Sequence, residues 1–149
     1  MQIKFRKATG EDADEILQME KSVESKIYHA YSTPSEIIEN YIKGGGAFMI
    51  TDEKDRIIGF ICYEMMTESL AHVNDLTIKP EYQNQGLGSK GMEFLLDRLK
   101  NIPKIELVTH PKNNPAIRLY LKFGFEIEGW KDNFYGDGEP RLILAKVKK

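Results

Sequence analysis

The chain lacks most of the features that mark secreted or membrane proteins. It contains one cysteine and therefore cannot form an intramolecular disulfide. Cys62 lies in an apolar run, residues 57–63, and we interpret it as a buried core residue. No apolar stretch approaches the roughly 18 residues of a transmembrane helix, and no apolar segment typical of a signal peptide follows Met1. We therefore expect a cytoplasmic protein with no membrane partner.

A large excess of one charge is also missing. The chain has 21 Lys and Arg against 23 Asp and Glu, a formal net charge of −2, so its overall charge does not favour a nucleic-acid partner and we expect none. Its three histidines are scattered, so we expect no metal site. The chain has 149 residues, of which 41% are hydrophobic and 30% charged. That composition is typical of one globular domain over residues 1–149, with a core that needs neither disulfide nor metal.

Hydrophobic periodicity predicts an α/β (α+β) chain with a mixed sheet. Alternating residues indicate strands, and apolar residues spaced three or four apart indicate helices. Residues 22–32 show no clear period. The expected order is β-α-α-β-β-β-α-β-α-β-β, with strands at residues 3–5, 47–51, 56–66, 71–78, 104–109, 126–129 and 141–147 and helices at residues 13–20, 34–42, 86–100 and 113–122.

One segment has the pattern of an anion site. A strand ending at Ile78 runs into a turn that contains Gly86 and Gly88, and a long amphipathic helix follows. The first amides of a helix lack intrahelical partners and carry positive potential, and glycines let phosphate oxygens approach the backbone. The letters G-x-G-x-x-G also occur here, ending at Gly91, but the acidic residue of a dinucleotide-binding unit is missing downstream. A pyrophosphate site is therefore the favoured interpretation.

Two motifs together resemble the GNAT superfamily of N-acetyltransferases. Residues 83–88 match its Q-x-x-G-x-G loop, and residues 113–125 match its N-x-x-A-x-x-L-Y-x-x-x-G-F segment. One helix and one strand separate the two motifs, as in that family. The resemblance covers nearly the whole chain and is weakest at residues 22–32 and after Gly129.

The resemblance implies a mostly antiparallel twisted sheet of about seven strands, with helices on both faces. It also implies a splay between the fourth and fifth strands, where acetyl-coenzyme A (acetyl-CoA) would enter. In the family, backbone groups at one strand edge bind the pantetheine arm, the loop binds the pyrophosphate, and the second motif contacts pantetheine, sulfur and phosphates. The matching cofactor-binding residues are Leu76, Thr77 and Ile78 on the strand; Gln83, Asn84, Gln85, Gly86, Leu87, Gly88 and Ser89 in the loop; and Asn113, Ala116, Tyr120 and Lys122 in the second motif.

Direct attack of a neutral amine on the thioester requires a proton acceptor for the amine and an acid for the leaving sulfur. The resemblance makes Tyr120 the acid, although its spacing also suits a core aromatic residue. Family members that acetylate protein N-termini often carry a glutamate five residues before the asparagine, but here that position is Val108. Other members place the base at the position of His72, whose imidazole suits proton transfer near neutral pH. Asp75 and Glu81 are further candidate bases.

The acceptor pocket is harder to predict. Tyr28, Tyr31 and Trp130, with Tyr135, are aromatic residues that could stack on a substrate, and Asp132, Asp137 and Glu139 could attract a cationic amine. His110 could lie near the cofactor channel, but a loop position facing solvent is the favoured expectation. A small-molecule amine is the first choice of acceptor, and a protein or peptide N-terminus is the alternative. A third possibility is a non-catalytic acetyl-CoA-binding module. A monomer or a homodimer would fit the family.

Overall fold

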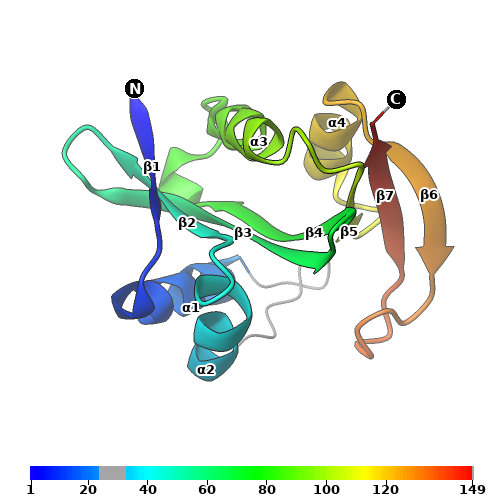
Figure 1. The fold of residues 1–149 in the computed structure, drawn as a ribbon, viewed down its shortest axis with the longest axis horizontal. Coiled ribbons are helices and arrows are strands. Elements are labelled where there is room, and N and C mark those ends of the chain that lie inside the picture. Colours follow the sequence, from blue (N-terminus) through cyan, green and yellow to red (C-terminus); the bar gives the residue numbers. More distant parts are fainter. Residues whose placement is uncertain (24–32, 149) are drawn as a thin grey trace.

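The computed structural model describes residues 1–23 and 33–148. Seven strands form one sheet in the order β1-β2-β3-β4-β5-β7-β6, which confirms the expected mixed, mostly antiparallel architecture. In Figure 1, α3 and α4 lie on one side of the sheet, and α1 and α2 on the other. The strands are β1 (Ile3–Lys7), β2 (Ala47–Asp52), β3 (Ile57–Thr67), β4 (Leu70–Ile78), β5 (Lys104–Thr109), β6 (Glu126–Lys131) and β7 (Arg141–Val147).

The helices begin and end close to the expected positions. They are η1 (Gly10–Asp12), α1 (Ala13–Ser22), α2 (Pro34–Glu36), η2 (Ile37–Ile42), η3 (Pro80–Tyr82), α3 (Leu87–Arg98) and α4 (Asn114–Lys122). The second expected helix is correct in position, but its Ile37–Ile42 part is π-helical, with a bond from the Lys43 amide to the Ile38 carbonyl. No helix within the described residues is long and apolar enough to span a bilayer.

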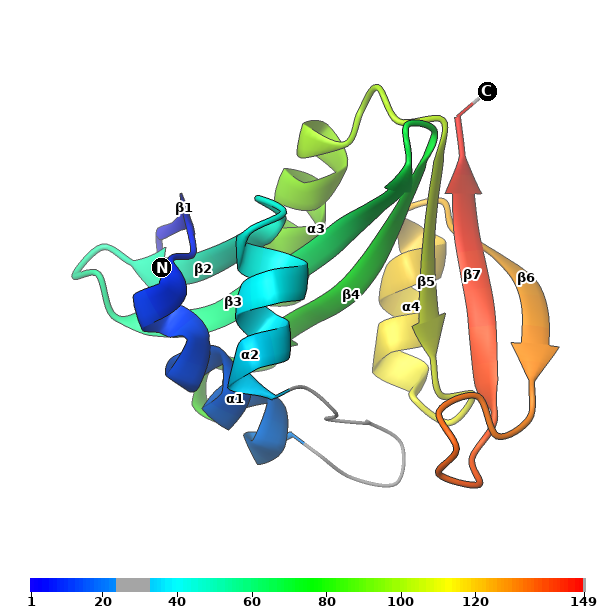
Figure 2. The same cartoon turned by 60° about the horizontal axis from the view of Figure 1, so that its bottom comes forward.

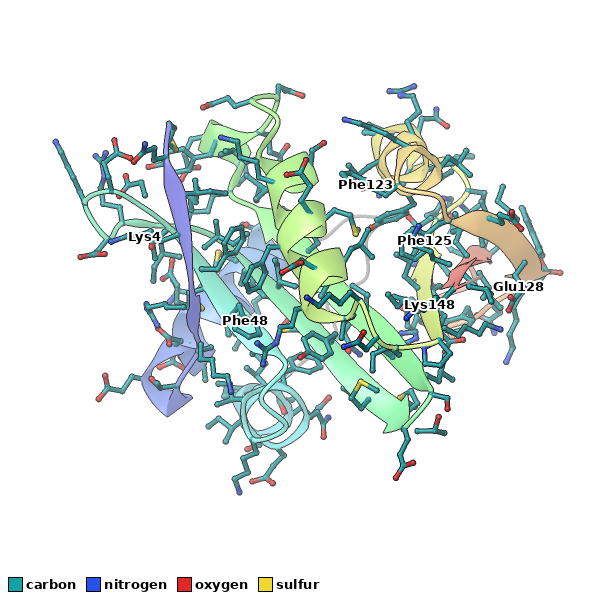
Figure 3. All side chains as sticks on the ribbon, turned by 45° about the horizontal axis from the view of Figure 1, so that its top comes forward. Lys4, Phe48, Phe123, Phe125, Glu128 and Lys148 are labelled. Carbon is teal, nitrogen blue, oxygen red and sulfur yellow. The ribbon has the colours of Figure 1, made fainter. Side chains whose placement is uncertain are left out.

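Each face of the sheet covers its own hydrophobic core. Under α3, side chains from β2 to β5 pack against Met92 and Leu95, and Phe125 adds to this core after α4. Figure 3 shows Phe48 from β2 near α3, and Phe125 near α4. On the other face, Ile16 of α1 and Ile37 pack against the sheet, and Cys62 is fully buried there as expected. Burial raises the pKa of the Cys62 thiol well above its ordinary value, so this cysteine stays a thiol and is a poor nucleophile.

The sheet opens along its parallel pair, β4 and β5. These strands are in register from Leu70–Lys104 to Val73–Leu107, and the pairing ends there. Beyond it β4 continues against β3 and β5 continues against β7, so each diverging strand keeps one bonded edge. Figure 2 shows the two strands close together at one end and apart at the other. The expected separation of the fourth and fifth strands is therefore present in the fold.

A β-bulge lies where the two strands part. Cys62 of β3 pairs with Asp75, but the next residue of β3, Tyr63, pairs with Val73, which leaves Asn74 as the extra residue on β4. Bulges bend a strand and increase its twist. The bulge therefore contributes to turning the end of β4 away from β5.

Candidate active site

A cavity of about 460 Å³ lies between the diverging ends of β4 and β5, and we call it the cleft. Most of its lining comes from the edges of the two strands and from α4, with smaller parts from α1 and the β6–β7 hairpin. The lining residues are Val23, Val73, Asn74, Asp75, Leu76, Thr77, Ile78, Pro80, Gln83, Leu107, Val108, Thr109, His110, Asn113, Ala116, Tyr120, Tyr135 and Arg141. The cleft thus joins parts of the chain that are distant in sequence.

The predicted pyrophosphate loop leads from the end of β4 to the start of α3. The Gln83 side chain donates from Nε2 to the Ile78 carbonyl at 2.9 Å, which fixes the loop against the strand. Asn84 and Gly86 take left-handed backbone conformations, with φ of 64° and 76°. Among the described residues no side chain caps α3, and its first turn contains no acidic residue, so its amides and positive potential suit an external anion. A Cβ on Gly86 would meet no protein atom within 4 Å, so the space there is open. These features fit a bound pyrophosphate.

The other predicted cofactor residues divide into those at the cleft and those outside it. Leu76, Thr77, Ile78, Gln83, Asn113, Ala116 and Tyr120 line the cleft. Asn113 also caps α4, because its Oδ1 accepts the Ala116 amide at 3.4 Å. Asn84, Gln85, Gly86, Gly88 and Ser89 form the loop and the first turn of α3, whereas the side chain of Leu87 is buried in the core. Lys122 is exposed at the end of α4, with its Nζ 5.6 Å from the centre of the Phe123 ring.

The structure brings Tyr120 and Asp75 together at the cleft. Burial raises the pKa of the Tyr120 phenol well above its ordinary value, and the negative charge of Asp75 adds a smaller contribution in the same direction. The hydroxyl is protonated at neutral pH, as it would also be at its ordinary pKa, and a general acid must be protonated. Its ring lies 5.9 Å from that of Phe125, so Tyr120 also packs against the core. The Thr77 hydroxyl donates to the Asp75 carboxylate, which keeps that carboxylate oriented.

His72 is not brought to the cleft. It lies in the part of β4 that is still paired with β5, opposite Glu106, and its Nδ1 is 3.2 Å from a Glu106 carboxylate oxygen. Of the candidate bases, Asp75 lines the cleft, whereas His72 and Glu81 do not. Val108, at the position where related enzymes often carry glutamate, lines the cleft with an apolar side chain.

The predicted acceptor residues have different positions. Trp130 lies on the edge strand β6, is 56% exposed, donates its indole N–H to Asp132 at 2.9 Å and does not line the cleft. Tyr28 and Tyr31 lie outside the described residues. Tyr135 does line the cleft. Asp137 and Glu139 are engaged by the protein itself, with Arg141 and His110 respectively.

His110 and Arg141 line the cleft. From the sequence, a position near the cofactor channel was only the second choice for His110, and Arg141 was not singled out. His110 was expected to face solvent and is instead 2% exposed; it follows directly after β5 and contacts Glu139 from the loop between β6 and β7. Arg141 is also 2% exposed, donates to Asp137 and to the Pro140 carbonyl, and lies 5.1 Å from the centre of the Tyr135 ring. A charged residue opening the apolar strand β7 was the one available signal for Arg141.

The sequence profile of the Acetyltransferase (GNAT) family matches residues 12–125. A Bacillus subtilis (strain 168) protein named as a candidate ribosomal protein bS18-alanine N-acetyltransferase is 30% identical over 137 residues, covering 90% of this chain and 88% of its own length. An N-alpha-acetyltransferase of Sulfolobus acidocaldarius is 26% identical over 155 residues, covering 95% of this chain and 90% of its own length.

Among solved structures, the Escherichia coli ribosomal-protein-S18-alanine N-acetyltransferase superposes with a TM-score of 0.80. Its sequence is 22% identical, and the match covers 98% of this chain and 94% of that one. This likeness concerns the fold. Together with the family profile, the open β4–β5 pair and the uncapped start of α3, it leads to one conclusion: this chain belongs to the GNAT family and is an acetyl-CoA-dependent N-acetyltransferase.

Proposed function

We propose that this enzyme acetylates the α-amino group at the N-terminus of a protein or peptide. The observation that carries this acceptor class is the pair of relatives named for N-terminal acetylation, each covering at least 90% of the chain. They favour this acceptor over the small-molecule amine that the sequence alone ranked first.

The amine chemistry supports the same choice. An α-amino group has a reference pKa of about 7.7–8.0, so roughly a tenth of it is neutral at pH 7, whereas an alkyl amine with a pKa of about 10.4 is neutral in roughly one molecule in 2,500. With Val108 in place of a glutamate, the cleft has less capacity to remove a proton. An α-amine needs less help from a base and therefore suits this site better.

Acetyl-CoA supplies an activated acetyl thioester with a thiol leaving group. The amides at the start of α3 bind its pyrophosphate, and the part of β4 that lies beyond the pairing with β5, from Leu76 to Ile78, orients the pantetheine arm. Asp75 accepts the proton that the attacking amine loses, directly or through water. Tyr120, whose hydroxyl is protonated at neutral pH, donates its proton to the departing sulfur. The reaction needs no covalent enzyme intermediate.

The test is a competition between amine classes, measured by thiol release and by mass spectrometry of the product. One peptide has a free N-terminal alanine. The matched peptide differs from it in two ways: its N-terminus is blocked, and it contains one internal lysine. Spermidine and free alanine complete the panel. We expect kcat/KM for the free N-terminus to exceed that of every other acceptor by at least about 10-fold. A higher value for the lysine, spermidine or free alanine would contradict the proposal.

A further inference from the structure

The polar contacts of His110 connect two walls of the cleft. Its Nδ1 accepts the backbone amide of Lys112 at 3.0 Å, and its Nε2 lies 2.9 Å from a Glu139 carboxylate oxygen. Because an N–H points at Nδ1, that nitrogen carries no proton, and the neutral ring has its proton on Nε2. His110 therefore donates to Glu139. With both ring nitrogens engaged, it is poorly suited to act as a base in the cleft.

Glu139 belongs to the loop between β6 and β7, residues 132–140, which is held together by its own hydrogen bonds. The Asn133 side chain accepts the Gly138 amide at 2.6 Å, and Asp137 accepts the Glu139 amide at 3.0 Å. Asp137 also accepts from the Arg141 guanidinium at 2.9 Å. These hydrogen bonds hold the loop together, and the hydrogen bond from His110 to Glu139 attaches it to the end of β5.

The loop lies on the side of the sheet from which an acceptor must approach. The predicted cofactor residues come from β4, the start of α3 and α4, and α3 and α4 lie above the sheet in Figure 1. The β6–β7 loop lies below it, on the same side as α1 and α2. An amine that attacks the thioester enters from the side that the cofactor leaves open. Tyr135 from the loop and Arg141 at its end line the cleft there.

We propose that His110 is a positioning residue for the acceptor: by donating to Glu139 it holds the β6–β7 loop so that Tyr135 and Arg141 form the acceptor-side wall. This inference rests on the proposed function for the identity of the acceptor. It assigns to His110 an effect on acceptor affinity, separate from cofactor binding and from proton transfer.

Two substitutions separate this role from a general loss of structure. In His110→Gln the side-chain amide nitrogen occupies nearly the position of Nε2 and can still donate to Glu139. In His110→Asn the amide reaches only the position of Nδ1, so the contact with Lys112 can remain while the bond to Glu139 is lost. Glu139→Ala removes the same bond from the other side, at a residue whose side chain is 37% exposed, so the fold should tolerate the change.

We expect His110→Asn and Glu139→Ala each to raise the KM of the acceptor about 10-fold, the scale of one hydrogen bond to a charged group. The KM of acetyl-CoA should stay within about 2-fold. His110→Gln should keep the acceptor KM within about 3-fold of the wild-type value, and the double variant His110→Asn with Glu139→Ala should be no worse than either single variant. Equal impairment of His110→Gln and His110→Asn, a rise in the KM of acetyl-CoA, or an unchanged acceptor KM would overturn the proposal.

Amide hydrogen exchange provides a readout that needs no acceptor. Residues 132–140 should exchange about 10-fold faster in His110→Asn and Glu139→Ala, and at the wild-type rate in His110→Gln. If the wild-type enzyme prefers a small amine, the proposed function fails while the exchange pattern and the KM for that amine still test His110. Unaltered exchange in all three variants would refute the positioning role even if N-terminal acetylation is established.

Discussion

The two walls of the cleft are built in different ways. The proposed cofactor wall uses backbone: the part of β4 beyond its pairing with β5, the start of α3, and a glycine with positive φ at Gly86. The acceptor wall uses side chains: His110 bonds Glu139, Arg141 bonds Asp137, and Tyr135 lies beside that guanidinium. A wall for one common cosubstrate can be made of amides and short motifs, whereas a wall for a particular acceptor depends on side chains that can differ between relatives.

The largest expected effect is that of Tyr120→Phe, which tests whether catalysis on the cofactor side depends on one side chain, the proposed acid. Removing the acid should lower kcat about 100-fold, the usual scale of general acid catalysis, while the Kd of acetyl-CoA stays within about 3-fold. Steady-state kinetics and calorimetry measure the two effects. Tyr41→Phe is the matched control, because it removes a buried tyrosine hydroxyl in the opposite core. A Tyr120→Phe enzyme with wild-type turnover would mean that the sulfur leaves without this acid.

Two glycines allow the walls to be disturbed separately. Gly86 and Gly136 have φ of 76° and 80°, and a Cβ at either would meet no atom within 4 Å. Valine at each should cost about 1–3 kcal/mol of local backbone strain. Gly86→Val should raise the Kd of acetyl-CoA about 10-fold or more, because the loop amides move. Gly136→Val should raise only the acceptor KM. If either variant changed the Kd of acetyl-CoA and the KM of the acceptor by the same factor, the two walls would not be independent.

The smallest expected effect concerns stability at high pH. The phenol of Tyr120 has a raised pKa in the folded protein, so its stabilising contribution is complete below about pH 10, the pKa of unfolded tyrosine, and is lost as pH rises toward the folded value. Wild-type stability should therefore fall relative to Tyr120→Phe by about 1.4 kcal/mol per pH unit above pH 10. Urea titrations of the two proteins from pH 8 to 11 measure the difference. If the difference in the free energy of unfolding between the two proteins stayed constant from pH 8 to 11, the Tyr120 hydroxyl would be solvated in the folded protein.

The contrast between the walls also explains what the sequence could predict. Strand and helix positions followed from local periodicity, and the loop at Gly86 followed from a short motif, because both depend on neighbouring residues. The bond from His110 to Glu139 joins residues 29 positions apart, and the bulge at Asn74 depends on its register with β3. Local sequence patterns reveal neither contacts between distant residues nor the register between strands. Trp130 shows the same limit, since an aromatic residue near a hairpin can face either the cleft or solvent.

The short parallel pairing of β4 with β5 has a consequence for how the molecule holds together. Four register positions, from Leu70 to Val73, join a four-stranded half of the sheet to a three-stranded half. Acetyl-CoA bound in the cleft would contact both halves of the sheet and hold them together. Because it binds only the folded form, a concentration of 100 times its Kd would add about 2.7 kcal/mol of stability. The supply of acetyl-CoA would then influence how long the enzyme persists as well as how fast it works.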